Sequence, residues 1–308
     1  MFRSFSRKKG IIKRKSSLDD TTIENHDSSN TVSLFVPPGH FYSPIANPED
    51  VRRDEGRIFD AERRLLPGIA LHENDQVALL ELLSQYLPEM PFGDLPNDRL
   101  RYGFANPSYS YSDGIFLYSM IRHFKPARII EVGSGYSSCL MLDVNDLFFG
   151  GKISCEFIDP YPDLLLSLLK IGEAKRISST PCRLQDVSVE KFQGLGANDV
   201  LFIDSTHVAK VGSDVNYLFF EVLPSLKPGV LIHIHDIFYP FEYPKSWVYE
   251  GRNWSENYLL RAFLQYNERF KIILFNTFLE HFHFELFATK MPLCLKNPGG
   301  SIWLRKIG

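Results

Sequence analysis

From residue 111 onward, short apolar runs of strand length alternate with longer segments of helical periodicity. This alternation constrains the fold strongly, because strands linked by helices of this length form crossover units and hence a parallel sheet covered on both faces. We expect seven strands, at residues 128–132, 153–158, 176–179, 199–203, 230–235, 271–278 and 301–306. The prediction is an α/β fold with a doubly wound, mostly parallel, seven-stranded sheet.

Helical periodicity marks the segments around these strands, at residues 113–123, 137–149, 162–170, near 189, at 214–226 and at 256–268. The last two expected strands are separated by a long connection in which we expect no helix. An antiparallel hairpin at the edge of the sheet would accommodate this pair.

Composition divides the chain into three parts. Residues 1–30 are rich in Ser, Lys, Asp and Asn and predict a disordered basic leader, although such a tail could also contact acidic lipid or a partner. Residues 31–110 alternate Pro-rich loops with short helical patterns, of which 74–87 is the clearest, and predict an N-terminal, mainly helical and loop cap. Residues 111–308 form the main domain.

Charge and cysteine usage limit the class of protein. Residues 1–15 hold seven Lys or Arg and no acid, so 37 acidic side chains face only 27 basic ones in the other 293 residues, which argues against a nucleic-acid groove. The four cysteines lack metal-ligand spacing and predict buried thiols in a reducing compartment. Without a signal peptide or an apolar run of membrane-spanning length, we expect a cytoplasmic protein with no membrane span.

A glycine-containing turn follows the first expected strand. Gly133-Ser134-Gly135 leads into a helix that Ser137 or Ser138 could cap. Glycines permit unusual backbone angles and let a ligand approach main-chain N–H groups closely. By itself, the pair also fits a plain tight turn from strand to helix.

The second expected strand ends in Asp159, which lies 24 residues after Gly135. This is the position of a carboxylate that accepts hydrogen bonds from ribose hydroxyls in doubly wound nucleotide-binding sheets. Asp159 could instead cap the helix that begins near Pro160 to Pro162, and the two roles can coexist.

Acids and imidazoles follow the fourth and fifth expected strands, where ligands bind in such sheets. Asp204 and Asp236 occupy equivalent strand exits, and His207 lies three residues beyond Asp204. These side chains predict a general base or a divalent metal site, although His207 could merely cap a turn. His235 fits either an active-site or a core role, and His233 is expected to be a core histidine.

The order Glu131-x-Gly133-x-Gly135, then Asp159, Asp204 and Asp236, resembles the class I S-adenosylmethionine-dependent methyltransferase family. Over residues 111–308 it is similar to the small-molecule O-methyltransferase branch of the methyltransferase family 24 type. The resemblance implies a Rossmann-like methyltransferase fold with S-adenosyl-L-methionine as cofactor. It implies that the cofactor is bound by eight residues: Glu131, Gly133, Ser134, Gly135, Ser137, Asp159, Asp186 and Asp204. Gln185 is a further candidate by position.

Metal dependence is a second implication of the resemblance. Metal-dependent catechol-type members place an Asp after the fourth strand and an Asp-Asn pair after the fifth, and Asp204 and Asp236 match two of these ligands. Ile237 stands where the Asn would be and cannot coordinate a cation. We therefore expect no metal unless His207 or His235 replaces the missing ligand.

Aromatic residues follow Asp236 in a stretch that we expect to be non-helical, from Phe238 to Trp254. They could form a wall or lid beside an acceptor pocket, or pack against the N-terminal cap. Lys210 and Asp214 fit either substrate orientation or a solvated helix start. Further candidates for the pocket are Asn106, Tyr109, Tyr111 and Asp113.

The hypothesis is transfer of a methyl group from S-adenosylmethionine to an oxygen of a small molecule or sugar precursor. His207 would act as the base, with Asp204, Asp236 and His235 as the other catalytic candidates. An NAD-dependent oxidoreductase is the alternative, but Ser138 stands where the dinucleotide fingerprint needs its third glycine. A non-catalytic nucleotide-binding module is a third reading, because fold does not determine function.

Overall fold

The sheet of the computed structural model, which describes residues 34–308, contains seven strands in the order β3-β2-β1-β4-β5-β7-β6. The predicted basic leader lies outside the described residues. The strands are β1 Arg128–Val132, β2 Ser154–Ile158, β3 Ser178–Thr180, β4 Val200–Ile203, β5 Leu231–His235, β6 Phe270–Phe275 and β7 Ser301–Lys306. All seven coincide with predicted strands to within a few residues, and the predicted doubly wound fold is confirmed.

Strands β1 to β5 pair in parallel, and the chain reverses its direction of winding between β1 and β4. Ligands in open α/β sheets bind at this kind of switch point, outside the carboxyl ends of the strands. β7 pairs antiparallel with both β5 and β6. The predicted antiparallel pair is therefore present, but β7 lies inside the sheet and only β6 forms the edge.

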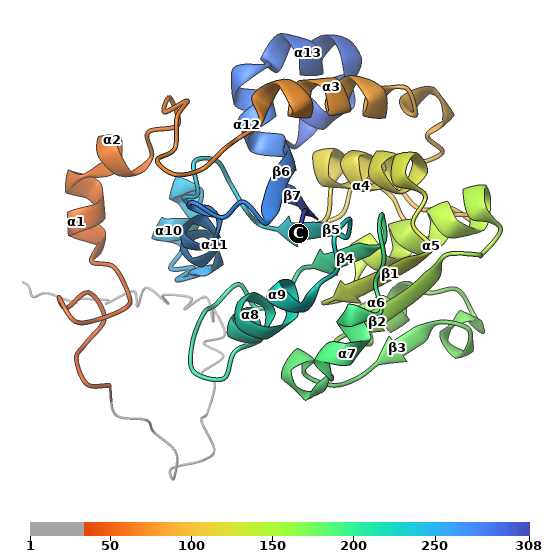
Figure 1. Cartoon of the computed structure of the whole chain (residues 1–308), viewed down its shortest axis with the longest axis horizontal. Helices are drawn as coiled ribbons and strands as arrows, with labels where there is room; N and C mark the ends of the chain where they lie inside the picture. Colours follow the sequence, from red (N-terminus) through yellow and green to blue (C-terminus); the bar gives the residue numbers. More distant parts are fainter. Residues whose placement is uncertain (1–33) are drawn as a thin grey trace, which may run out of the picture.

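Helices cover both faces of the sheet (Figure 1). α4 Tyr111–Phe124 and α5 Tyr136–Phe149 lie on one side, and a helical segment from residue 214 to 225 lies on the other. That segment comprises α8 Asp214–Tyr217, the π-helical η4 Leu218–Val222 and α9 Leu223–Ser225. β4 and β5 are buried along their whole length, which explains why their sequences read as continuous apolar runs.

The remaining helices between β2 and β6 are short, apart from α11. They are α6 Asp163–Leu168, η2 Glu173–Lys175, η3 Leu184–Asp186, α7 Val189–Gln193, α10 Lys245–Tyr249 and α11 Glu256–Leu264. α10 corrects the expectation that residues 238–254 contain no helix. Within residues 34–308, we find no helix that combines the length and the apolar character needed to cross a bilayer.

The connection between β6 and β7 is helical, so the expectation of no helix there is wrong. It contains α12 Asn276–Phe282, α13 Phe284–Lys290 and η5 Pro292–Lys296. β6 ends before Asn276 because this buried side chain bonds to other elements: its Oδ1 accepts the N–H of Ser301 at 2.9 Å, and its Nδ2 donates to the carbonyl of Pro298 at 3.1 Å. Phe278 and Leu279 are fully buried on the helix that follows.

Residues 34–110 contain helices and loops but no strand: α1 Pro48–Arg53, α2 Glu55–Ile58, α3 Glu73–Ser84 and η1 Leu87–Glu89. α3 lies beside α4, α12 and α13, whereas α1 and α2 lie apart from the sheet (Figure 1). The buried Gln76 fastens α3 to β6, since its Oε1 accepts the N–H of Phe275 at 2.7 Å and its Nε2 donates to the carbonyl of Leu71 at 2.5 Å.

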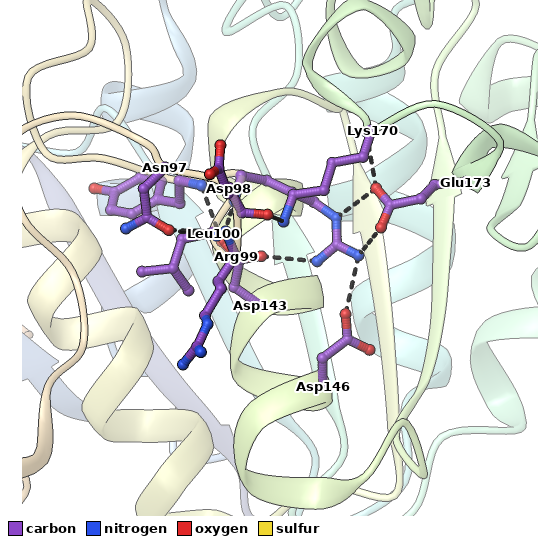
Figure 2. Close-up of polar contacts among 10 residues, drawn as sticks. Asn97, Asp98, Arg99, Leu100, Asp143, Asp146, Lys170 and Glu173 are labelled. Atoms are coloured by element: carbon purple, nitrogen blue, oxygen red, sulfur yellow. Dashed lines mark hydrogen bonds and ion pairs between the residues drawn. The ribbon is translucent and has the colours of Figure 1, made fainter.

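Arg101 connects the loop that follows these helices to the main sheet domain. Figure 2 shows three of its partners, Asp143, Asp146 and Glu173. The Arg101 guanidinium contacts Asp143 at 2.7 Å and Asp146 at 2.9 Å on α5, and Glu173 at 2.8 Å in η2. The backbone N–H groups of Arg101 and Tyr102 also donate to Asp143. This network fixes the segment that continues to Pro107–Ser110, which borders the cavity described next.

Candidate active site

A cavity of about 770 Å³ opens at the carboxyl ends of the parallel strands. The loops that follow β1, β2, β4 and β5 all contribute to its lining, together with residues 107–110 from the N-terminal side. Its volume lies within the range of about 300–1,000 Å³ for sites that bind small molecules and cofactors. The position is the one expected for a ligand site in a doubly wound sheet.

Gly133 allows the loop after β1 to pass directly over the end of β4. Its φ is +83°, and a Cβ added there would lie 1.8 Å from the carbonyl oxygen of Asp204. The N–H of Gly133 donates to Ile158 at the end of β2, at 2.9 Å. No residue with a side chain fits this path, so the predicted need for glycine has a specific structural cause.

Glu131 is fully buried beneath this loop and does not line the cavity. Its carboxylate accepts hydrogen bonds from the hydroxyls of Ser137 and Ser138, and the Ser138 hydroxyl also accepts the N–H of Gly135 at 3.0 Å. Burial raises the pKa of Glu131 to about 8, although the two serine hydroxyls oppose the shift. Glu131 thus shapes the loop, while Gly133, Ser134, Gly135 and Ser137 line the cavity.

Asp159 faces the cavity and holds the glycine loop from the side. Its Oδ2 accepts the N–H and the hydroxyl of Ser134, both at 2.9 Å, and its Oδ1 accepts the N–H of Tyr161 at 2.8 Å. α6 begins only at Asp163, with Pro162 as its N-cap residue. Asp159 therefore organises the turn after β2 and does not cap the helix.

The two candidates in η3 point in different directions. Gln185 lines the cavity and donates to the carbonyl of Gly212 at 2.6 Å. Asp186 is not part of the lining and instead pairs with Arg183 at 2.8 Å on the surface. Of this pair, only Gln185 borders the space in which a ligand would bind.

Asp204, His207 and Asp236 converge at the exits of β4 and β5. His207 Nε2 lies 3.4 Å from Asp204 Oδ1 and 3.6 Å from Asp236 Oδ2. One ligand atom from each residue falls within 4.8 Å of the other two, an arrangement that could hold a metal ion. Both N···O distances exceed the range of about 2.7–3.2 Å of an N–H···O hydrogen bond.

His207 lies behind the cavity wall, which corrects its predicted place in the pocket. It is only 5% exposed and does not line the cavity, whereas Asp204 and Asp236 do. The ring of Trp254, which is part of the lining, covers the imidazole at a centroid distance of 4.5 Å. Of these three residues, only Asp204 and Asp236 therefore face the cavity.

The pKa values of the two carboxylates shift in opposite directions. Burial raises the pKa of Asp236, although His235 and His207 oppose the shift. Burial would also raise the pKa of Asp204, but the neighbouring His235 and His207 outweigh it and the net effect lowers that pKa. For His207, burial favours the neutral ring, yet the neighbouring carboxylates of Asp204 and Glu256 raise its pKa well above the usual value.

Glu256, the first residue of α11, was missed by the sequence reading. It is fully buried, and its Oε2 lies 2.9 Å from His207 Nδ1. In the sequence, it looks like an ordinary acidic residue in the first turn of a helix, where carboxylates are common. Only the folded chain brings it to His207, 49 residues away.

Two further histidines, His235 and His233, lie on β5 and differ in their surroundings. His235 lines the cavity, with Nε2 3.5 Å from Asp236 Oδ1. His233 is fully buried and stacks on Phe202 at 4.1 Å, as expected of a core histidine, but neither of its ring nitrogens has a hydrogen-bond partner among residues 34–308. Tyr109 packs on His235 at 5.0 Å, and its buried hydroxyl has no hydrogen-bond partner among residues 34–308.

An aromatic wall borders the cavity, formed by residues that follow β5. It consists of Phe238, Trp247 and Trp254, and the guanidinium of Arg252 lies 4.1 Å from the ring centroid of Trp247. Lys210, Asp214, Tyr109 and Asp113 also border the cavity, whereas Asn106 and Tyr111 do not. Asn106 binds backbone groups of its own loop, and the hydroxyl of Tyr111 donates to Asp94.

Two sequence comparisons match parts of the chain. A family model described as a methyltransferase domain matches residues 130–237, from β1 to the residue after Asp236. An uncharacterized protein from Archaeoglobus fulgidus is 35% identical over 173 residues, which cover 54% of this chain and 76% of that protein.

Solved structures of methyltransferases also superpose on the chain, at low identity. The O-methyltransferase TomG of Streptomyces achromogenes, in complex with SAM, is 14% identical, with a TM-score of 0.43 over 84% of this chain and 99% of that one. The SAH-bound Podospora anserina methyltransferase PaMTH1 is 15% identical, with a TM-score of 0.42 over 90% and 100% of the two chains. The family assignment rests on the methyltransferase-domain model: its match to residues 130–237 places this chain among the class I S-adenosylmethionine-dependent methyltransferases, of the methyltransferase family 24 type.

Proposed function

We propose that this chain transfers a methyl group from S-adenosylmethionine to an oxygen atom of a small molecule or sugar precursor. The observation that carries the proposal is that one cavity is bordered by Asp159 and the Gly133–Ser137 loop on one side and by Asp236 and the aromatic wall on the other. A donor and an acceptor bound in this cavity would lie next to each other, which is the main requirement for a displacement reaction.

The residues present suit an adenosyl amino acid. A carboxylate has about four acceptor sites, and Asp159 uses three, one of them for a rotatable Ser134 hydroxyl that a ribose hydroxyl could displace. α5 begins at Tyr136, which lines the cavity, so its positive N-terminal end would stabilise the carboxylate of the ligand. Gln185 would then border the adenine.

When bound, S-adenosylmethionine supplies a methyl group on a sulfonium that is its own leaving group. The chain's own task is to orient an acceptor hydroxyl and take up its proton. Asp236 is the better proton acceptor of the two carboxylates, because it lines the cavity and burial raises its pKa. Asp204 would remain charged, and His207 would stabilise both carboxylates from behind.

The acceptor would rest on the aromatic wall. Trp247, Trp254 and Phe238 offer ring faces to a flat ring or to the apolar face of a sugar. We also propose that residues 34–110 form a cap over this site, since Pro107–Ser110 belong to the lining. The acidic character of the chain beyond residue 15 supports a small-molecule acceptor over nucleic acid.

A divalent cation held by Asp204, His207 and Asp236 is a second candidate for activating the acceptor. Ligand atoms about 2.0–2.1 Å from one Mg²⁺ lie roughly 3 Å apart, close to the spacings of 3.4 and 3.6 Å at His207 Nε2. Calorimetric titration of the chelator-treated chain with Mn²⁺ tests this candidate. Binding that Asp236→Ala abolishes would support it, and the absence of binding by the unaltered chain would reject it.

Thermal unfolding with three ligands tests the main proposal. A ligand at 100 times its Kd that binds only the native state stabilises it by about 2.7 kcal/mol, which raises Tm by several degrees in a chain of this size. We expect S-adenosylmethionine and S-adenosylhomocysteine to raise Tm and NAD⁺ to leave it unchanged. A rise with NAD⁺ alone would support the oxidoreductase alternative, and no rise with any of the three would argue against an adenosyl site.

A further inference from the structure

Glu256 is a buried carboxyl group beside the cavity that methyl transfer by itself does not account for. It is fully buried, it does not line the cavity, and its Oε1 has no hydrogen-bond partner among residues 34–308. Its Oε2 lies 2.9 Å from His207 Nδ1. A buried carboxylate is costly unless it is paired, so the contact with His207 needs an explanation.

The backbone holds the two residues in a fixed relation. His207 has φ +59°, and its carbonyl accepts the N–H of Ser255 at 2.9 Å and that of Glu256 at 3.1 Å. The hydroxyl of Ser255 in turn accepts the N–H of Ala209 at 2.9 Å. The loop after β4 is thus attached to the start of α11 on both sides of the imidazole.

The orientation of the ring follows from these contacts. Nδ1 faces Glu256, and Nε2 faces Asp204 at 3.4 Å and Asp236 at 3.6 Å. Trp254 covers the ring, so the imidazole is enclosed. Each ring nitrogen of histidine is either a donor or an acceptor, and the partner of one nitrogen determines the role of the other.

We propose that Glu256 is a positioning residue whose carboxylate keeps the proton of His207 on Nδ1, so that Nε2 is the ring atom presented to Asp204 and Asp236. This role rests on the proposed function, in which those two carboxylates face the acceptor. When the Nδ1 proton is donated to Glu256, two states of Nε2 are possible. A protonated Nε2 presents a second N–H to the carboxylates, and an unprotonated Nε2 presents a lone pair to a cation between them. In both states, Glu256 supports the acceptor side of the cavity from outside it.

The competing arrangement places the proton on the glutamic acid. Burial raises the pKa of Glu256, although His207 opposes the shift, and nearby Asp214 and Asp204 add to the rise. A neutral Glu256 would donate to Nδ1, and the ring proton would then sit on Nε2. The two arrangements differ in whether Nδ1 carries a proton, and this difference can be observed directly.

NMR of the full chain labelled with ¹⁵N-histidine, after chelator treatment, tests the proposal. The His207 signals are assigned by their loss in His207→Asn. We expect a downfield, slowly exchanging proton bonded to Nδ1, because a hydrogen bond to a buried carboxylate protects it from water. In Glu256→Gln this proton should stay on Nδ1 but move upfield, since a neutral amide oxygen is a weaker acceptor. In Glu256→Leu its slow exchange should be lost.

A matched control is Glu242→Gln, because Glu242 accepts the hydroxyl of Tyr258 on the same helix without contacting His207. It should leave the His207 signals unchanged. An Nδ1 without a proton in the unaltered chain, or an unchanged Nδ1 proton in Glu256→Gln, would overturn the proposal. The experiment needs neither donor nor acceptor, so its failure would be distinguishable from a failure to bind S-adenosylmethionine.

Discussion

Asp159 shows how a single side chain can serve both the fold and a ligand. It accepts three hydrogen bonds from the loops around it and still borders the cavity. The glycine loop would therefore be held in position before a ligand arrives, which lowers the free energy needed to order the site on binding.

Replacing Asp159 by Ala should weaken the binding of S-adenosylhomocysteine. Hydrogen bonds to a charged group contribute about 1.5–3 kcal/mol, so the expected loss in affinity is roughly 10- to 100-fold. Calorimetric titration measures it. Asp163→Ala is the matched control, because Asp163 is exposed at the start of α6 and does not line the cavity. Equal affinity in the Asp159 variant and the unaltered chain would reject the ribose assignment.

Sequence pattern located the residues at strand ends but not their orientations. Asp159, Asp204 and Asp236 line the cavity because they directly follow buried parallel strands, whose ends meet at one edge of the sheet. His207 and Asp186 lie in loops, where contacts from distant segments decide the direction of the side chain. Asp186 pairs with Arg183 at the surface, and His207 contacts Glu256 outside the cavity lining.

Among the elements, the loop from residue 97 to 102 depends on an ion-pair network more than on regular structure (Figure 2). The Arg101 side chain is 9% exposed and contacts carboxylates of Asp143, Asp146 and Glu173. Lys170 adds a hydrogen bond to the carbonyl of Asp98 at 2.7 Å. Together these contacts join the N-terminal segment to α5 and to η2.

Arg101→Met should destabilise the chain, because it leaves the buried carboxylate of Asp143 without its cation. Removing one partner of a buried ion pair costs about 3–5 kcal/mol, and urea denaturation measures the loss. Arg99→Met is the control: Arg99 is exposed two residues away, and its change should stay within about 0.5 kcal/mol. Similar stabilities of the two variants would show that the network contributes little.

The elements that the sequence pattern did not reveal are α10, α12 and α13. Residues 271–278 read as one apolar strand, yet the chain leaves the sheet at Asn276 because its amide bonds to Ser301 and Pro298. These partners are more than twenty residues away, so no local periodicity contains the information. The longer helices α4 and α5, and the strands β1 and β4, were predictable because burial imposes their pattern locally.

At the level of the complete chain, the order of the strands explains why one cavity can serve two ligands. β1 and β4 are neighbours at the point where the two halves of the sheet meet, so in the proposed function the exits of β1 and β2 would face the donor and those of β4 and β5 would face the acceptor. The aromatic wall and residues 107–110 then enclose the acceptor end. This placement of donor and acceptor at different strand ends follows from the topology, so we expect it to be unchanged when the acceptor-binding residues change.

A crystal structure with S-adenosylhomocysteine tests this account most directly. We predict that the adenosyl ribose will lie within hydrogen-bonding distance of Asp159, with the amino-acid end against the Gly133–Ser137 loop and the sulfur directed toward Asp236. A ligand bound elsewhere, or a cavity in which the Asp159 carboxylate faces bulk water, would contradict it.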